Sequence, residues 1–100
     1  MKLGILVNTD KGLEDVIGIT KEALSRGHEV SIFTMDAATK LLKNPDYSGL
    51  CRLEGVRMAF CAHSAQGEGV DAGLVPREIT CGSQFDNAIM NNESDVVIVL

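Results

Sequence analysis

The chain has 100 residues, of which 45% are hydrophobic and 4% aromatic, and its formal net charge is −5. This length predicts one domain, residues 1–100, and a hydrophobic fraction this high excludes a disordered chain. An acidic balance without a lysine or arginine cluster argues against direct nucleic-acid binding, and no apolar run is long enough to span a membrane.

The N-terminal third predicts a strand–helix–strand unit. The apolar run Leu3–Val7 is typical of a buried parallel strand, and it is too short for a signal peptide. We therefore expect a cytoplasmic protein. A helix over 11–26, capped by Asp10, ends at Gly27 and leads into a second strand over 28–34. Such a unit implies a right-handed crossover between parallel strands.

The middle of the chain predicts shorter elements. Asp36 is expected to cap a helix over 37–42, which Asn44 and Pro45 end. A loop with one helical turn near 50–53 follows and leads into the next strand.

The remaining sequence predicts a strand ending at Cys61, an irregular stretch over 70–76 and a short strand over 78–81. A helix from Ser83 through Asn92 is expected next, with Phe85, Ala88 and Ile89 pointing inward. The last predicted element is a strand over 96–100. Five strands that alternate with helices predict an α/β fold. We expect a three-layer α/β/α sandwich around a mainly parallel five-stranded sheet.

The turn after the first strand, Asn8–Gly12, contains one glycine where a dinucleotide-binding loop carries three. No phosphate-binding loop motif occurs elsewhere. We therefore expect no cofactor.

Cys61 is expected at the carboxyl end of a strand, which is the edge at which α/β sheets bind ligands and place their active sites. A cysteine-phosphatase loop requires arginine at Gly67, a rhodanese-type loop requires arginine within 62–70, and a thioredoxin motif requires cysteine at Ser64; all three are excluded. What remains is a thiol beside backbone N–H groups and the start of a helical turn, which lower a thiol pKa. The alternative is a thiol that only fills the core.

His63 and Ser64 are the candidate polar assistants of Cys61, although a histidine here is equally consistent with an exposed loop. Cys81 ends the following strand. If these two strands are neighbours, their ends lie about 5 Å apart, and Cys61 and Cys81 could meet as attacking and resolving thiols. The alternative for Cys81 is a core cysteine, and Cys51 lies toward the opposite edge of the sheet.

A metal site is not expected. Cys61, His63 and Cys81 supply only three ligands and lack the paired spacing that predicts zinc. With an odd number of cysteines and no Cys-x-x-Cys pair, a disulfide framework is not expected either.

The sequence resembles the DsrE/DsrF-like sulfur-relay proteins, which include sulfurtransferase subunits that feed tRNA thiolation. The similar segments cover nearly the whole chain and are Leu3–Asn8, Ala23–Val30, Cys61–Ala65 with Gly69-Val70, Gly82-Ser83 and Asp95–Val99. The most specific of them is the strand-end cysteine followed eight residues later by Gly-Val.

This resemblance implies a persulfide carrier. Cys61 matches the family's active cysteine, which accepts a sulfane sulfur from a donor protein and passes it to an acceptor protein. It also implies trimers or hexamers, homomeric or built from related subunits. The chain departs from the family at Gly67 and Glu68, where basic residues are common. An acidic residue there is expected to raise the thiol pKa, and the glycines to weaken the helix.

Two other functions remain open. A non-catalytic assembly or small-ligand-binding subunit of the same fold predicts a buried, unreactive Cys61 and a large apolar oligomer interface. A two-cysteine redox protein predicts a reversible disulfide between Cys61 and Cys81.

Overall fold

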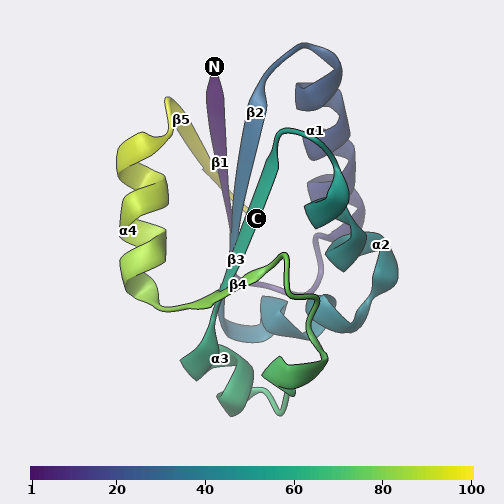
Figure 1. Cartoon of the computed structure of the whole chain (residues 1–100), viewed down its shortest axis with the longest axis vertical. Coiled ribbons are helices and arrows are strands. Elements are labelled where there is room, and N and C mark those ends of the chain that lie inside the picture. Colours follow the sequence, from purple (N-terminus) through teal and green to yellow (C-terminus); the bar gives the residue numbers. More distant parts are fainter.

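A computed structural model describes residues 1–100, in which five strands form one sheet in the order β4-β3-β2-β1-β5 (Figure 1). The strands are β1 (Lys2–Val7), β2 (Glu29–Thr34), β3 (Val56–Cys61), β4 (Thr80–Gly82) and β5 (Val96–Val99). All four pairings are parallel. The predicted three-layer α/β/α sandwich around a parallel five-stranded sheet is confirmed.

The strand order decides which helices cover which face. From β1 to β4 the chain steps in one direction, so right-handed crossovers place their connections on one face. These connections include α1 (Leu13–Ser25), the 3₁₀ helix η1 (Asp36–Lys43), α2 (Pro45–Ser48) and the 3₁₀ helix η2 (Gly49–Arg52). The return from β4 to β5 runs in the opposite direction, and α4 (Gln84–Glu93) therefore covers the other face (Figure 1).

Two short elements lie at the carboxyl end of the sheet, where α3 (Ala62–Gly67) follows β3 directly (Figure 1). The 3₁₀ helix η3 (Ala72–Leu74) interrupts the stretch that was expected to be irregular. No helix of the protein is both long and apolar enough to cross a membrane.

The two faces of the sheet differ in how much core they hold. Successive side chains of a strand point to opposite faces. The larger core faces α1 and includes Leu3, Ile5, Val7, Val30, Ile32, Met58 and Phe60. The core on the α4 side has only three buried residues, which are Phe33, Cys61 and Met90. Cys61 therefore belongs to the thinly covered face.

The start of α1 differs from the prediction. The helix begins at Leu13 with Gly12 as its N-cap, and Asp10 does not cap it. No side chain caps this end, and the acidic residues Glu14 and Asp15 in the first turn supply favourable charge near the helix N-terminus.

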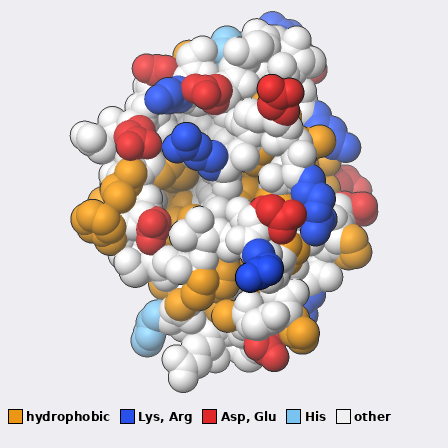
Figure 2. All heavy atoms as spheres, in the orientation of Figure 1, with side chains coloured by type: hydrophobic (Ala, Val, Ile, Leu, Met, Phe, Trp, Pro, Cys, Tyr) orange, Lys and Arg blue, Asp and Glu red, His pale blue; other side chains and the backbone are white.

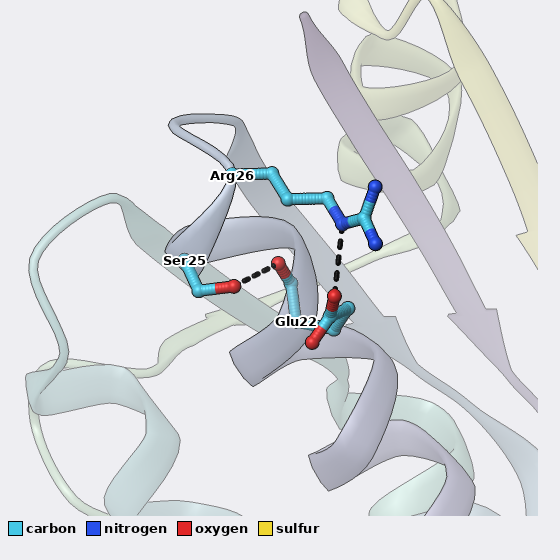
Figure 3. A network of polar contacts seen from close by, with 3 residues as sticks. All are labelled: Glu22, Ser25 and Arg26. Atoms are coloured by element: carbon cyan, nitrogen blue, oxygen red, sulfur yellow. Dashed lines mark hydrogen bonds and ion pairs between the residues drawn. The ribbon is translucent and has the colours of Figure 1, made fainter.

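The other end of α1 is closed by local hydrogen bonds. Arg26 Nε donates to Glu22 Oε1 at 2.8 Å, and Ser25 Oγ donates to the Glu22 carbonyl at 2.8 Å (Figure 3). Gly27 follows with a φ of +82°, which confirms the predicted C′ glycine. The chain then turns directly into β2.

The region after β2 is more helical than expected. Asp36 does not cap η1 with its side chain; it is the first residue of that helix, after Met35 as N-cap, and has a φ of +50°. Asn44 and Pro45 end η1, as predicted, but they also start α2. The Asn44 side chain accepts a hydrogen bond from the Asp46 N–H at 2.9 Å, and Pro45 occupies the first helical position.

The helix α4 begins as predicted. Ser83 caps it, because Ser83 Oγ accepts from the Phe85 N–H at 3.2 Å while the Asp86 carboxylate accepts from the Ser83 N–H at 2.9 Å. Asp86 is half-buried and Met90, one turn later on the same side of the helix, is buried. This side of α4 therefore faces the sheet.

The prediction that Phe85, Ala88 and Ile89 point inward is wrong. Phe85 is 71% exposed and Ile89 38% exposed, and Ala88 is also exposed. In the orientation of Figure 1, hydrophobic side chains project from the side of the molecule on which α4 lies (Figure 2). The capping interaction and the burial of Met90 set the rotation of the helix. The apolar stripe of α4, which consists of Phe85, Ala88 and Ile89, therefore faces solvent.

Candidate functional site

Cys61 is both the last residue of β3 and the N-cap of α3. Its Sγ accepts a hydrogen bond from the Ser64 N–H at 3.5 Å, which is the usual N-cap contact with sulfur in place of oxygen. The residue is only 5% exposed. The structure thus places a covered thiol at the carboxyl edge of the sheet, at the start of a helical turn.

Two opposing effects act on this thiol. Burial raises the pKa of Cys61, because it disfavours the thiolate. Hydrogen bonds from the Ser64 hydroxyl, the Ser64 N–H, the Gln84 side chain and the His63 N–H lower it, and together they outweigh burial. The pKa of Cys61 therefore lies below the ordinary thiol value, which increases the fraction of the nucleophilic thiolate.

Gln84 is the residue that the sequence prediction missed. It is the first residue of α4, and the turn from β4 brings it to the thiol because Gly82 lies opposite Cys61 in the β3–β4 ladder. Asn87 Nδ2 donates to Gln84 Oε1 at 3.1 Å, and Gln84 Nε2 lies 3.8 Å from Met35 Sδ. The sequence held a signal for Gln84: it directly follows Ser83, the predicted helix cap, and that helix follows the strand expected to lie beside the strand of Cys61.

Ser64 and His63, the two predicted polar assistants of Cys61, act on its thiol through different groups. Ser64 contributes both its hydroxyl and its N–H to Cys61. His63 contributes only its N–H, while its side chain is exposed and forms no hydrogen bond within the chain. The imidazole of His63 is thus exposed to solvent and has no partner within the chain.

The expected effect of Glu68 is wrong. Its carboxylate lies 3.4 Å from Lys40 Nζ of η1, in an ion pair on the outer surface. Glu68 is not among the groups that shift the pKa of Cys61. Glu68 is therefore paired with Lys40 and does not raise the pKa of the Cys61 thiol.

Gly67 and Gly69 terminate α3 and do not prevent the helix from forming. Gly67 is the last helical residue, and Gly69 follows in the left-handed region with a φ of +72°. The Val70 N–H then donates to the Ala65 carbonyl at 2.8 Å, and both side chains are buried in the larger core. This is a Schellman ending with its hydrophobic contact. The Gly-Val pair therefore anchors the short helix that begins at the thiol.

Cys81 does not meet Cys61. The strands β3 and β4 are neighbours, as expected, but Cys61 lies opposite Gly82 and Cys81 lies opposite Phe60. Facing residues of a parallel pair share a side of the sheet, so the thiols of Cys61 and Cys81 lie on opposite faces. Cys81 is exposed, so it is not a core cysteine either.

The remaining titratable groups do not assemble a metal site. No group of three His, Cys, Asp or Glu side chains is arranged to hold a metal ion. Cys51 lies in η2, where burial and the Glu78 carboxylate raise the pKa of its thiol. Of Cys51 and Cys61, only Cys61 has a thiol pKa below the ordinary value.

No protein-family model and no curated protein matches the sequence. Two solved structures share the fold over nearly their whole length. One is a protein of unknown function, MTH1491, from Methanobacterium thermoautotrophicum, with a TM-score of 0.78 and 14% identity over 99% of this chain and 98% of that one. The other is the ychN protein from E. coli, with a TM-score of 0.71 and 12% identity over 99% and 97%. At these identities the likeness establishes the complete five-stranded fold, and the fold alone.

Proposed function

We propose that this chain is a DsrE/DsrF-like sulfur-relay protein, a sulfurtransferase component that carries a persulfide on Cys61. The observation that supports the proposal is the convergence of hydrogen-bond donors on one strand-end sulfur. Ser64, Gln84 and His63 supply four such donors, and they lower the pKa of Cys61 in spite of its burial.

The chemistry uses this stabilised thiolate twice. In loading, the Cys61 thiolate attacks the outer sulfur of a donor persulfide, a new S–S bond forms, and the donor leaves as its thiolate. In transfer, an acceptor thiolate attacks the outer sulfur of the Cys61 persulfide and Cys61 leaves as a thiolate. Neither step requires an external oxidant or reductant. A low pKa favours Cys61 as nucleophile and as leaving group.

The partners follow from the same chemistry. Sulfur must pass between sulfur atoms in contact, so donor and acceptor proteins each bring a thiol to the carboxyl edge of the sheet. A persulfide extends about 2 Å beyond Sγ, which carries the transferable sulfur outward from a residue that is 5% exposed. A homo- or hetero-oligomer, trimeric or hexameric, belongs to this proposal.

The test is mass spectrometry of the intact protein after incubation with a small persulfide donor. We expect one added sulfur atom in the wild type and in Cys81→Ser, and none in Cys61→Ser. Cys81→Ser is the matched control because Cys81 is exposed and lies in the neighbouring strand β4. Absence of the added sulfur, or its retention in Cys61→Ser, would refute the proposal.

A second candidate is a non-catalytic assembly subunit of the same fold. The burial of Cys61 and the outward apolar stripe of α4 favour it. The rate of thiol alkylation at neutral pH separates the two candidates: a persulfide carrier reacts faster at Cys61 than an unactivated thiol does, whereas an assembly subunit leaves Cys61 unreactive.

A further inference from the structure

The side-chain amide of Gln84 is the first of three amides in a row along α4. Gln84, Asn87 and Asn91 are three and four residues apart, which places them on one side of the helix. Asn87 Nδ2 donates to Gln84 Oε1 at 3.1 Å, and Asn91 Nδ2 donates to Asn87 Oδ1 at 2.8 Å. This amide row therefore connects the last turn of α4 with its first residue, which acts on the Cys61 thiol.

One further contact fixes the direction of the donors in the amide row. Asn91 Nδ2 also donates to the backbone carbonyl of Asn87 at 2.8 Å. A carbonyl oxygen only accepts hydrogen bonds, so the group that Asn91 turns toward Asn87 must be its NH₂ group. Both N–H bonds of that group are then used, one on the carbonyl oxygen of Asn87 and one on its Oδ1.

The same reasoning determines the orientation of Gln84. Because Asn91 donates to Oδ1 of Asn87, the NH₂ group of Asn87 is the end that faces Gln84. An NH₂ group only donates, so Gln84 turns Oε1 toward Asn87 and its own Nε2 away from it. A reversed Gln84 amide would set two NH₂ groups against each other and would lose the hydrogen bond between the two side chains.

The NH₂ group of Gln84 is thereby directed to sulfur atoms. Gln84 Nε2 lies 3.8 Å from Sδ of Met35, and Met35 packs against the small core cluster that contains Cys61. An amide nitrogen carries two N–H bonds, so one can point to the Met35 thioether while the other serves the Cys61 sulfur. In agreement with this orientation, the Gln84 side chain is one of the groups that lower the pKa of the Cys61 thiol.

We propose that Asn87 and Asn91 are positioning residues for the candidate nucleophile. They hold the Gln84 amide with its NH₂ group toward the sulfur of Cys61. Gln84 is exposed, so without this anchor its amide would rotate in water and would present Oε1 to the sulfur as readily as Nε2. An N–H group stabilises a thiolate, whereas an oxygen in the same place repels it. The inference refines the site on which the proposed function rests, but its measurement requires no sulfur transfer.

The asparagines act on the thiol through a neutral dipole. The charged or titratable side chains on the strands and helices that border Cys61 are Glu29 of β2, Arg57 of β3, His63 of α3, Cys81 of β4, and Asp86 and Glu93 of α4. None of these side chains is among the groups that shift the pKa of Cys61. A change in the thiol pKa on substitution of Asn87 is therefore expected to come through Gln84.

An isosteric replacement of Asn87 tests the proposal. Asn87→Asp removes the NH₂ group, so Gln84 is expected to turn its own NH₂ group toward the new carboxylate and its Oε1 toward Cys61. The pKa of Cys61 should rise, and its alkylation rate at neutral pH should fall by about tenfold, as a pH profile of the rate measures. An unchanged profile overturns the proposal.

The added charge of this variant is controlled in a second background. In Gln84→Leu the amide that carries the effect is absent, so the further change Asn87→Asp should alter the alkylation rate by less than about twofold. A tenfold fall in both backgrounds also overturns the proposal, because the carboxylate would then act on the thiol directly.

Asn91 provides an independent test with a matched control. Asn91→Asp removes the donor that fixes Asn87, so the thiol pKa should rise again, although Asn91 lies about two helical turns from Gln84. Asn92→Asp adds the same charge at the next residue, which is exposed and lies outside the amide row, and should keep the wild-type profile. Equal effects of the two variants, or no effect of either, contradict the proposal.

These outcomes are separate from those of the proposed function. A persulfide on Cys61 together with an unchanged Asn87→Asp profile would remove the positioning role and leave the sulfur carrier. The expected profiles without any persulfide on Cys61 would do the reverse.

Discussion

Gln84, at the start of α4, lies beside Cys61, at the end of β3, and its side chain lowers the pKa of the Cys61 thiol. This contact joins the only helix on the thinly covered face to the candidate nucleophile. It also ties the activation of the thiol to the position of α4, because the helix cap at Ser83 precedes the donor directly.

Replacement of this donor is the first prediction. Gln84→Leu removes one of the hydrogen bonds that favour the thiolate, so the pKa of Cys61 rises and its alkylation rate at neutral pH falls by about tenfold. The pH profile of the alkylation rate measures both changes. Gln66→Leu, on the exposed side of α3, is the matched control and is expected to keep the wild-type profile. Identical profiles for both variants would show that Gln84 does not act on the thiol.

Substitutions of Ser64 and His63 should affect the thiol pKa differently. Ser64→Ala removes a hydroxyl donor and retains the N–H, so the pKa of Cys61 rises. His63→Ala retains the only group of His63 that reaches the sulfur, its N–H, and is expected to leave the thiol pKa unchanged. Alkylation profiles of the two single variants check this. A larger rise in the thiol pKa in His63→Ala than in Ser64→Ala would show instead that the imidazole of His63 lowers the pKa of Cys61.

The shifted thiol also makes stability depend on pH. Because the folded-state pKa of Cys61 lies below the unfolded value, the folded state binds fewer protons between these two values. The wild type should therefore gain stability relative to Cys61→Ser as the pH rises from below the folded pKa to above the ordinary thiol range, and lose that gain as the pH falls again.

Urea denaturation of both proteins at several pH values measures this difference. The comparison with Cys61→Ser is necessary because the raised pKa of Cys51 acts in the opposite direction in both proteins. A difference in the free energy of unfolding that is constant with pH contradicts the lowered pKa of Cys61.

The ending of α3 provides a stability prediction with an internal control. Gly69 has a φ of +72°, and a side chain there costs about 1–2 kcal/mol of unfolding free energy. Gly67 is helical, and alanine there should stabilise the protein by about 0.5–1 kcal/mol. An added Cβ meets no atom within 4 Å at either position, so only backbone conformation separates the variants. Urea denaturation of Gly69→Ala and Gly67→Ala should show opposite signs.

Much of the local structure could be predicted from the sequence. The strand that ends at Cys61, the C′ glycine at Gly27 and the helix cap at Ser83 depend on residues close together in the chain. The start of α1 was predicted less well, because Asp10 is a good capping residue that the chain does not use. The helical character of α2 was missed because Pro45 both ends one helix and starts another.

By itself the sequence determined the alternation of strands and helices and the place of one cysteine at a strand end, because hydrophobic period and turn residues act locally. Only the tertiary structure decided that Cys81 lies on the opposite face from Cys61, that Gln84 reaches the sulfur, and that the apolar stripe of α4 faces outward. These features depend on strand register and on helix rotation, and both are set by contacts between segments far apart in the chain.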